Sequence, residues 1–236
     1  MKNCMPILAA DYSETLNCVD MANSSNCQLI EWRLDALNGK VDMEKVISTC
    51  HSIKNKTDKK LIVTLRTARQ GGLRDMDPSN YVWMVRRLID LAELDFVDIE
   101  MANCAGDAQL KMLTGMAKRK GVNVIVSYHD MLYTESAREI YMRLCHMKYL
   151  GADLPKVAYM ANKQGDVEAV INGATTAAAE IGPVIAIAMG ELGKITRIEG
   201  DKFGSVINFL KPIGSKSDQA KNIGQLDEDQ LWVGDL

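Results

Sequence analysis

A single lysine, Lys156, interrupts the otherwise apolar run ADLPKVAYMA, residues 152–161. Lysine is rarely buried completely, because removing an unpaired ammonium from water costs much free energy. Asp153 lies three residues earlier, and the next acidic residue along the chain is Asp166. An amine in apolar surroundings is typical of a nucleophile that attacks a carbonyl carbon.

Polar residues also interrupt other apolar runs at alternate positions, and alternate residues of a strand share one face. These sets are Glu31 with Arg33, Thr64 with Arg66, Ser127 with His129, and Lys156 with Ala158 and Met160. Each position has a structural explanation when taken singly, such as an interior Glu31–Arg33 ion pair or a structural histidine. Together they favour one charged cavity at the carboxyl ends of the strands, where barrel enzymes carry their chemistry.

The predicted cavity carries a surplus of positive charge, because Arg33, Arg66, Arg197 and Lys156 outnumber Glu31. Positive neighbours and burial lower the pKa of a lysine, and a change from about 10.4 to 7–8 takes roughly 4 kcal/mol. The product is a neutral amine with a histidine on the next strand for proton transfer. The residues alone therefore predict a Schiff-base lyase or aldolase that acts on a keto acid.

Eight short apolar runs alternate with longer amphipathic runs, about thirty residues to a unit. The strand candidates lie near Met5 and Ile30 and end at Arg66, Glu100, His129, Met160, Met189 and Phe209. This pattern predicts an α/β fold, a single-domain (β/α)8 TIM barrel over residues 1–236. A doubly wound open sheet is the alternative, but the chain has no G-x-G-x-x-G motif, and GELGK at Gly190 lacks Walker A spacing.

Helix starts support the same reading. Asp42 and Asp77, the latter followed by Pro78, are predicted N-caps, and Thr134 or Ser136 opens a helix that stops near Gly151.

The composition of the chain argues against several classes of binding partner. With 28 basic and 31 acidic residues the net charge is −3, and no basic stripe indicates a nucleic-acid or membrane partner. The N-terminus lacks a secretory apolar core, and no run is long enough to span a membrane. The six scattered cysteines lack metal-site spacing, so we expect no metal and a cytoplasmic protein with reduced thiols.

Five motifs in order along the chain carry a resemblance to a known family. They are EWRLD (31–35), VTLRTARQGG (63–72), VSYHD (126–130), GADLPKVAYM (151–160) and TRIEGDKFGSVINF (196–209). Together they resemble type I 3-dehydroquinate dehydratase. The resemblance implies a homodimeric barrel that converts 3-dehydroquinate to 3-dehydroshikimate and water in the shikimate pathway, without a cofactor.

The resemblance also implies roles for the site residues. Lys156 would form the Schiff base, and His129 would act as general acid and base. Arg197 would clamp the substrate carboxylate, a task suited to bidentate recognition. Glu31, Arg33 and Arg66 would bind the polar edges of the ring, and Met189 and Phe209 would form apolar walls.

Two regions depart from the family pattern. Gln70 stands where the family usually has glutamate, so it can hydrogen-bond His129 but cannot stabilise an imidazolium by charge. Residues 211–225 are predicted to form the loop that closes the site, with Lys221 at the usual serine position and Gln225 as the closing glutamine. An alternative alignment uses Ser215 and Gln219.

Two other functions remain open. One is a different Schiff-base enzyme on the same barrel, such as a sugar-phosphate aldolase, for which Gly204-Ser205 is the candidate phosphate cradle. The other is a barrel that only binds a shikimate-like acid.

Overall fold

Eight parallel strands form a ring in the computed structural model of the chain, which describes residues 1–219 and 224–231. Each strand pairs with its sequence neighbour, and β8 pairs with β1, in the order β7-β6-β5-β4-β3-β2-β1-β8. The strands are β1 (Lys2–Ile7), β2 (Leu29–Arg33), β3 (Lys60–Thr64), β4 (Phe96–Glu100), β5 (Asn123–Asp130), β6 (Leu154–Met160), β7 (Ile185–Met189) and β8 (Ile207–Phe209).

The ring is nearly closed between β7 and β8. Val184 and Ser205 form a single parallel bridge there, and the amide N–H of Val206 donates to the carbonyl of Val184 at 2.9 Å. The strands and the connecting helices confirm the predicted single-domain (β/α)8 barrel.

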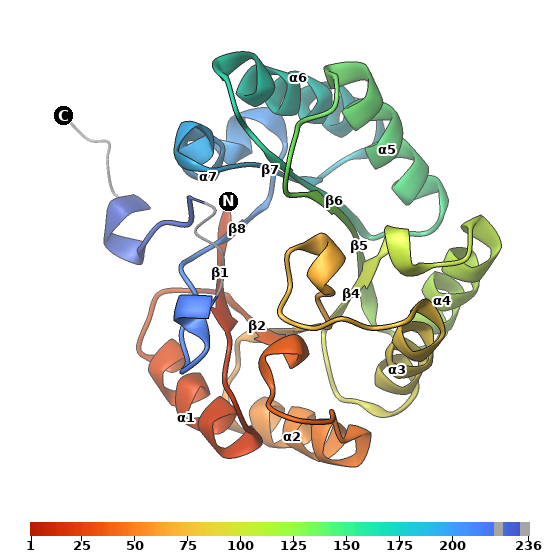
Figure 1. The fold of residues 1–236 in the computed structure, drawn as a ribbon, viewed down its shortest axis with the longest axis vertical. Helices are drawn as coiled ribbons and strands as arrows, with labels where there is room; N and C mark the ends of the chain where they lie inside the picture. The colour runs from red at the N-terminus through yellow and green to blue at the C-terminus, as the bar shows by residue number, and fades with distance from the viewer. Residues whose placement is uncertain (220–223, 232–236) are drawn as a thin grey trace.

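Helices connect the strands and lie outside the ring (Figure 1). They are α1 (Tyr12–Asn23), α2 (Met43–Lys56), α3 (Pro78–Leu91), α4 (Asp107–Lys120), α5 (Ala137–Tyr149), α6 (Gln164–Ile181) and the single turn α7 (Ile195–Ile198). Asp42, Asp77 and Ser136 accept hydrogen bonds from backbone N–H groups of the first turns of α2, α3 and α5, so the predicted N-caps are confirmed. Of the two candidates for α5, Ser136 is the cap.

Strand alternation divides the apolar side chains into two cores. The larger core lies between the strands and the helices and contains outward residues such as Ile30, Trp32 and Val157. The smaller core fills the interior of the barrel with Leu29, Ile62, Ile125, Ile185 and other residues at alternate positions. The inner core forms a floor beneath the polar residues nearer the carboxyl ends of the strands.

The described residues after β8 form only short 3-10 turns. One of them, η7 (Glu228–Leu231), follows Gln225. Before it lies another 3-10 turn, η6 (Ser217–Gln219). Within the described chain, no helix is long and apolar enough to cross a membrane. All six cysteines are free thiols, four of them buried.

Candidate active site

A pocket opens at the carboxyl ends of the strands and contains about 700 Å³ of space, including its solvent-open mouth. All the predicted site residues that the structure describes line it: Glu31, Arg33, Arg66, Gln70, His129, Lys156, Met189, Arg197, Phe209 and Gln225. They come from six of the strands or the turns that follow them and from α7. The structure therefore brings the predicted set together, and the role of each member stays a prediction.

Lys156 lies on β6 with its side chain buried inside the barrel, 4% exposed. Its neighbour in sequence, Asp153, is not its partner, because that carboxylate accepts the amide N–H of Val124 at 2.7 Å. Instead, Nζ of Lys156 lies 3.3 Å from Oδ2 of Asp98 on β4 and 3.9 Å from the centre of the Phe209 ring. The lysine is thus buried with a partner that lies 58 residues away in sequence.

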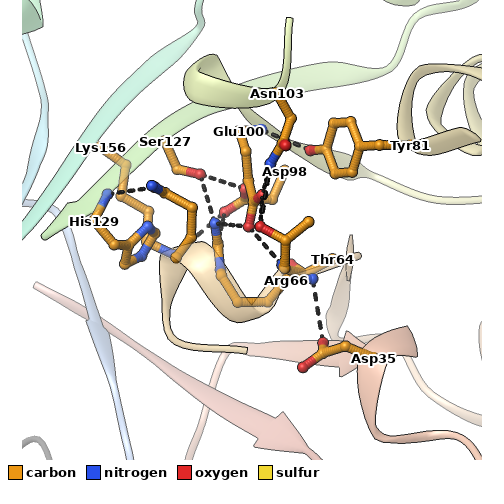
Figure 2. A network of polar contacts seen from close by, with 12 residues as sticks. Asp35, Thr64, Arg66, Tyr81, Asp98, Glu100, Asn103, Ser127, His129 and Lys156 are labelled. Carbon is orange, nitrogen blue, oxygen red and sulfur yellow. Dashed lines mark hydrogen bonds and ion pairs between the residues drawn. The ribbon is translucent and has the colours of Figure 1, made fainter. Parts of the chain in front are cut away.

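Arg66 follows β3 and is the centre of a buried polar network (Figure 2). Its guanidinium donates to Asp98 at 2.8 Å, to Glu100 at 2.9 Å and to Ser127 at 2.9 Å. Burial alone would lower the pKa of Arg66, but the charges of Asp98 and Glu100 raise it instead. The turn that carries Arg66 is compact, because a Cβ at Gly72 would lie only 2.1 Å from the Arg66 carbonyl oxygen.

This network corrects the predicted surplus of positive charge. Asp98 and Glu100 are both buried, and Asp35 is buried against Arg33. Together with Glu31, the four carboxylates equal in number the four cations at the site, Arg33, Arg66, Lys156 and Arg197. The prediction that an uncompensated surplus of arginines surrounds the lysine is therefore wrong.

His129 lies on β5, half-buried, beside β6 in a register that pairs it with Ala158. Burial and the positive charges of Arg66, Lys156 and Arg33 hold the pKa of His129 well below its ordinary value of 6.5. The imidazole is therefore neutral at neutral pH and is available as a base. Within the described chain, its buried Nδ1 has no hydrogen-bond partner.

Gln70 contacts His129, as predicted, but through the backbone. Its Oε1 accepts the amide N–H of His129 at 2.7 Å, and the side chain is buried. The glutamine therefore fixes the end of β5 rather than the ring of His129.

Glu31 and Arg33 both face the pocket but do not pair with each other. Glu31 accepts a hydrogen bond from the Thr64 hydroxyl at 2.7 Å. Arg33 donates to both oxygens of Asp35, at 2.8 and 2.7 Å. Asp35 also accepts the amide N–H groups of Arg66 and Leu73, so it joins the turns after β2 and β3.

Arg197 lies on α7 and is 1% exposed. The Thr196 hydroxyl anchors this turn to β7, because it donates to the Gly193 carbonyl and accepts the amide N–H of Ala188. Burial lowers the pKa of Arg197 to about 10, so the guanidinium stays charged at neutral pH. Met189 and Phe209, at the ends of β7 and β8, also line the pocket.

The segment after β8 brings Gln225 to the pocket, and its side-chain amide donates to the Leu210 carbonyl at 3.0 Å. Gln219 is exposed, and Ser215 donates to Glu14 and does not line the pocket. The preference for Gln225 over Gln219 is therefore supported by position. Lys221 lies outside the described residues.

Sequence reasoning missed Asp98, Glu100 and Asp35. The signal for the first two was present, because Phe96, Asp98 and Glu100 alternate along β4 as the recognised sets do. Asp35 follows the end of β2, and only the tertiary structure brings it to the next turn.

The fold and the pocket define a (β/α)8-barrel enzyme with a buried lysine and three arginines at the carboxyl ends of its strands. Comparison with known proteins specifies the family. The chain belongs to the type I 3-dehydroquinase family, whose model matches residues 3–231. This confirms the predicted family and its class of enzyme, a hydro-lyase.

Individual relatives match over most of their length. The 3-dehydroquinate dehydratases of Alkaliphilus oremlandii and Syntrophotalea carbinolica are 35% and 33% identical over 211 residues, covering 88% of this chain and 82% and 83% of theirs. The crystal structure of the Clostridium difficile type I 3-dehydroquinate dehydratase, which carries covalently modified comenic acid, aligns with a TM-score of 0.87 at 28% identity. That alignment covers 98% of this chain and 88% of the other.

Proposed function

We propose that this chain dehydrates 3-dehydroquinate to 3-dehydroshikimate through a Schiff base on Lys156, as a step of the shikimate pathway. The observation that carries the proposal is the placement of a buried lysine and a neutral histidine on neighbouring strands of an arginine-lined pocket. Family membership supplies the substrate. Covalently modified comenic acid in a relative supports covalent chemistry with an organic acid in this family.

The first stage is condensation of Lys156 with the ring ketone. His129 is neutral and takes a proton from the ammonium, which frees the amine lone pair to attack the carbonyl carbon. The protonated histidine then assists the departure of the carbonyl oxygen as water. The product is an iminium, which draws electrons from the neighbouring carbon.

The second stage is elimination. His129 removes the proton from the carbon next to the iminium, and the electron pair moves towards nitrogen to give an enamine. The electrons return as the ring hydroxyl leaves, and His129 gives it a proton, so water departs. Hydrolysis of the product iminium frees Lys156.

Substrate binding falls to the charged side chains around the pair. Arg197 holds the carboxylate of the substrate, because its buried guanidinium stays charged and suits bidentate recognition. Glu31, Arg33 and Arg66 bind the ring hydroxyls, and Gln225, on the closing segment 211–225, lines the same pocket.

The alternative functions have less support. The candidate phosphate cradle of an aldolase, Gly204-Ser205, lies by the first residues of β7, at the end of the barrel opposite the pocket. The Ser205 hydroxyl there accepts the amide N–H of Ala186. A protein that only binds a shikimate-like acid has no need for a buried lysine beside a neutral histidine.

An assay with 3-dehydroquinate tests the proposal, because the conjugated enone product has an ultraviolet absorbance that the substrate lacks. Lys156→Ala is expected to abolish turnover, and His129→Ala is expected to lower kcat and to accumulate covalent intermediate. Equal turnover in the two variants and the unaltered enzyme would contradict both roles. Failure of the folded, unaltered enzyme to convert 3-dehydroquinate would contradict the substrate.

We also propose that the enzyme is a cytoplasmic homodimer, which the family resemblance implies. Light scattering of the purified chain tests the dimer by its molar mass, and a monomer at assay concentrations would contradict it.

A further inference from the structure

Asp98 lies against the nitrogen that the proposed reaction uses. Its Oδ2 is 3.3 Å from Nζ of Lys156 and 2.8 Å from Nη2 of Arg66 (Figure 2). Asp98 is 1% exposed and does not line the pocket, so it reaches the lysine from behind the substrate space.

The carboxylate is fixed on both oxygens. The Ser127 hydroxyl donates to Oδ1 at 2.6 Å, while Arg66 holds Oδ2. Burial alone would raise the pKa of Asp98, but the charges of Arg66 and Lys156 and the hydrogen bonds hold it below its ordinary value. Asp98 is thus a preorganised anion.

The nitrogen also contacts the Phe209 ring, whose centre lies 3.9 Å from Nζ. An aromatic face attracts a cation, as a carboxylate does. The nitrogen of Lys156 therefore contacts two groups that both attract a positive charge.

We propose that Asp98 is a catalytic residue that provides the fixed counter-charge of the iminium on Lys156. The inference rests on the proposed Schiff-base function and deepens it, since it names the group that stabilises the covalent intermediate. Preorganised charge at the point where charge develops is commonly the largest single contribution to catalysis.

The reaction balances with Asp98 ionised throughout. Nitrogen enters as an ammonium with three protons and becomes an iminium with one, and the other two protons leave with the ketone oxygen as water. A C=N bond replaces the C=O bond, and the iminium carries the same single positive charge at nitrogen as the ammonium did. Asp98 therefore faces a cation in the resting enzyme and in the iminium without changing its own protonation.

Neutral intermediates, the carbinolamine and the enamine, form between these cationic species. Asp98 therefore assists the steps that create positive charge and not those that remove it. Loss of water from the carbinolamine and loss of the hydroxyl from the enamine both create positive charge beside Oδ2, so Asp98 favours them. Removal of the α-proton discharges the nitrogen, so Asp98 disfavours that step. In the absence of the carboxylate, the charge-forming steps become more rate-limiting.

Asp98→Asn tests this inference, because the amide keeps the shape and removes the charge. We expect kcat to fall on the order of 10²-fold, as for other preorganised groups, with KM changed less than about threefold. The fraction of enzyme that borohydride reduces to a stable adduct during turnover should fall. The isotope effect for substrate deuterated at the carbon next to the ketone should also decrease.

Glu100→Gln is the matched control, because Glu100 is the other buried carboxylate on Arg66, whereas the carboxylate that pairs with Lys156 among the described residues is that of Asp98. It should retain the trapped fraction and the isotope effect of the unaltered enzyme. Equal losses in Asp98→Asn and Glu100→Gln would overturn the inference and assign Asp98 only the support of Arg66. Values for Asp98→Asn within twofold of the unaltered enzyme would also overturn it.

Two further comparisons keep the outcomes distinct. If the unaltered enzyme forms no adduct on Lys156, the proposed function fails, whatever Asp98 does. If Asp98→Asn does not fold, as judged by circular dichroism, Ser127→Ala decides the question. It leaves Asp98 in place and removes the hydroxyl that donates to Oδ1 of Asp98 and accepts from Arg66. A fall in kcat of about 10-fold at constant KM would support the counter-charge, and unchanged kcat would overturn it.

Discussion

At the residue scale, a few neighbours determine the pKa of His129 and the ion pair of Lys156. The positive charges of Arg66, Lys156 and Arg33, added to burial, lower the pKa of His129 and keep its ring neutral. Lys156 pairs with Asp98, which is 58 residues away in the sequence, so no local sequence pattern indicates the pair. The histidine is therefore the group in this pair that accepts the first proton.

The pH dependence of kcat/KM follows from the lowered pKa of His129. A base must be neutral, so the acid limb of the profile should lie below pH 6.5, the ordinary pKa of histidine. Gln70→Glu adds a carboxylate beside His129, which should raise the histidine pKa and move the acid limb to higher pH. Steady-state rates of both proteins between about pH 4.5 and 9 measure this shift.

Gln70→Ala is the control, because it removes the amide without adding charge. An acid limb above pH 6.5 in the unaltered enzyme, or the same limb in all three proteins, would contradict this view of the site.

At the element scale, the segment after β8 is attached to the barrel partly through residues that do not line the pocket. Glu14 on α1 accepts the backbone N–H and the hydroxyl of Ser215 and the amide N–H of Ala10. The amide N–H of Lys211 also donates to the Leu226 carbonyl at 3.0 Å, and this hydrogen bond joins the two ends of the segment. These contacts determine where Gln225 meets the pocket.

Glu14→Ala should weaken this attachment without touching the reacting groups. Loss of hydrogen bonds worth about 1 kcal/mol net predicts a rise in KM of roughly fivefold, with kcat little changed. Limited proteolysis should show faster cleavage within residues 211–225. Ser215→Ala removes only the hydroxyl contact and should give a smaller effect, whereas an unchanged KM and cleavage rate in Glu14→Ala would contradict the proposed function of this segment.

The directions of side chains on the strands could be predicted from the sequence, whereas the position of the segment after β8 could not. Alternation correctly predicted that Glu31, His129 and Lys156 on β2, β5 and β6, and Arg66 just after β3, face the pocket. Parallel strands covered on both faces have only two directions for a side chain. Asp98 and Glu100 alternate along β4 in the same way, although they were not among the predicted site residues. The position of Gln225 depends on tertiary packing, since a Cβ at Gly224 would lie 2.3 Å from the Gly190 carbonyl oxygen, and such packing leaves no local pattern.

At the scale of the whole molecule, the barrel was predictable because its repeated units are local, whereas the charge of its interior was not. The predicted cavity contained four cations and one carboxylate, but the barrel also brings Asp35, Asp98 and Glu100 to it from separate turns and strands. Buried charges are costly unless they are paired, so a balanced interior is what stability requires. The lysine consequently meets a counter-ion instead of a surplus of arginines.

The buried ionisable groups also give the molecule a specific sensitivity to acid. The pKa of His129 is lower in the folded chain than in the unfolded chain, so unfolding takes up a proton when the pH falls below about 6.5. This proton uptake decreases the free energy of unfolding by at most about 1.4 kcal/mol per pH unit. The lowered pKa values of Asp35 and Asp98 add a further loss below about pH 3.9. His129→Asn should flatten the first part of this decrease, as measured by urea unfolding between about pH 5 and 7.5. Equal slopes for both proteins would contradict the lowered histidine pKa.

The most direct test of the account is borohydride reduction in the presence of 3-dehydroquinate, followed by intact-protein mass measurement and peptide mapping. We expect one reduced substrate adduct per chain, located on the peptide that contains Lys156, and none in Lys156→Ala. An adduct on another lysine, or its absence from correctly folded, unaltered enzyme, would contradict the central claim that Lys156 forms the Schiff base.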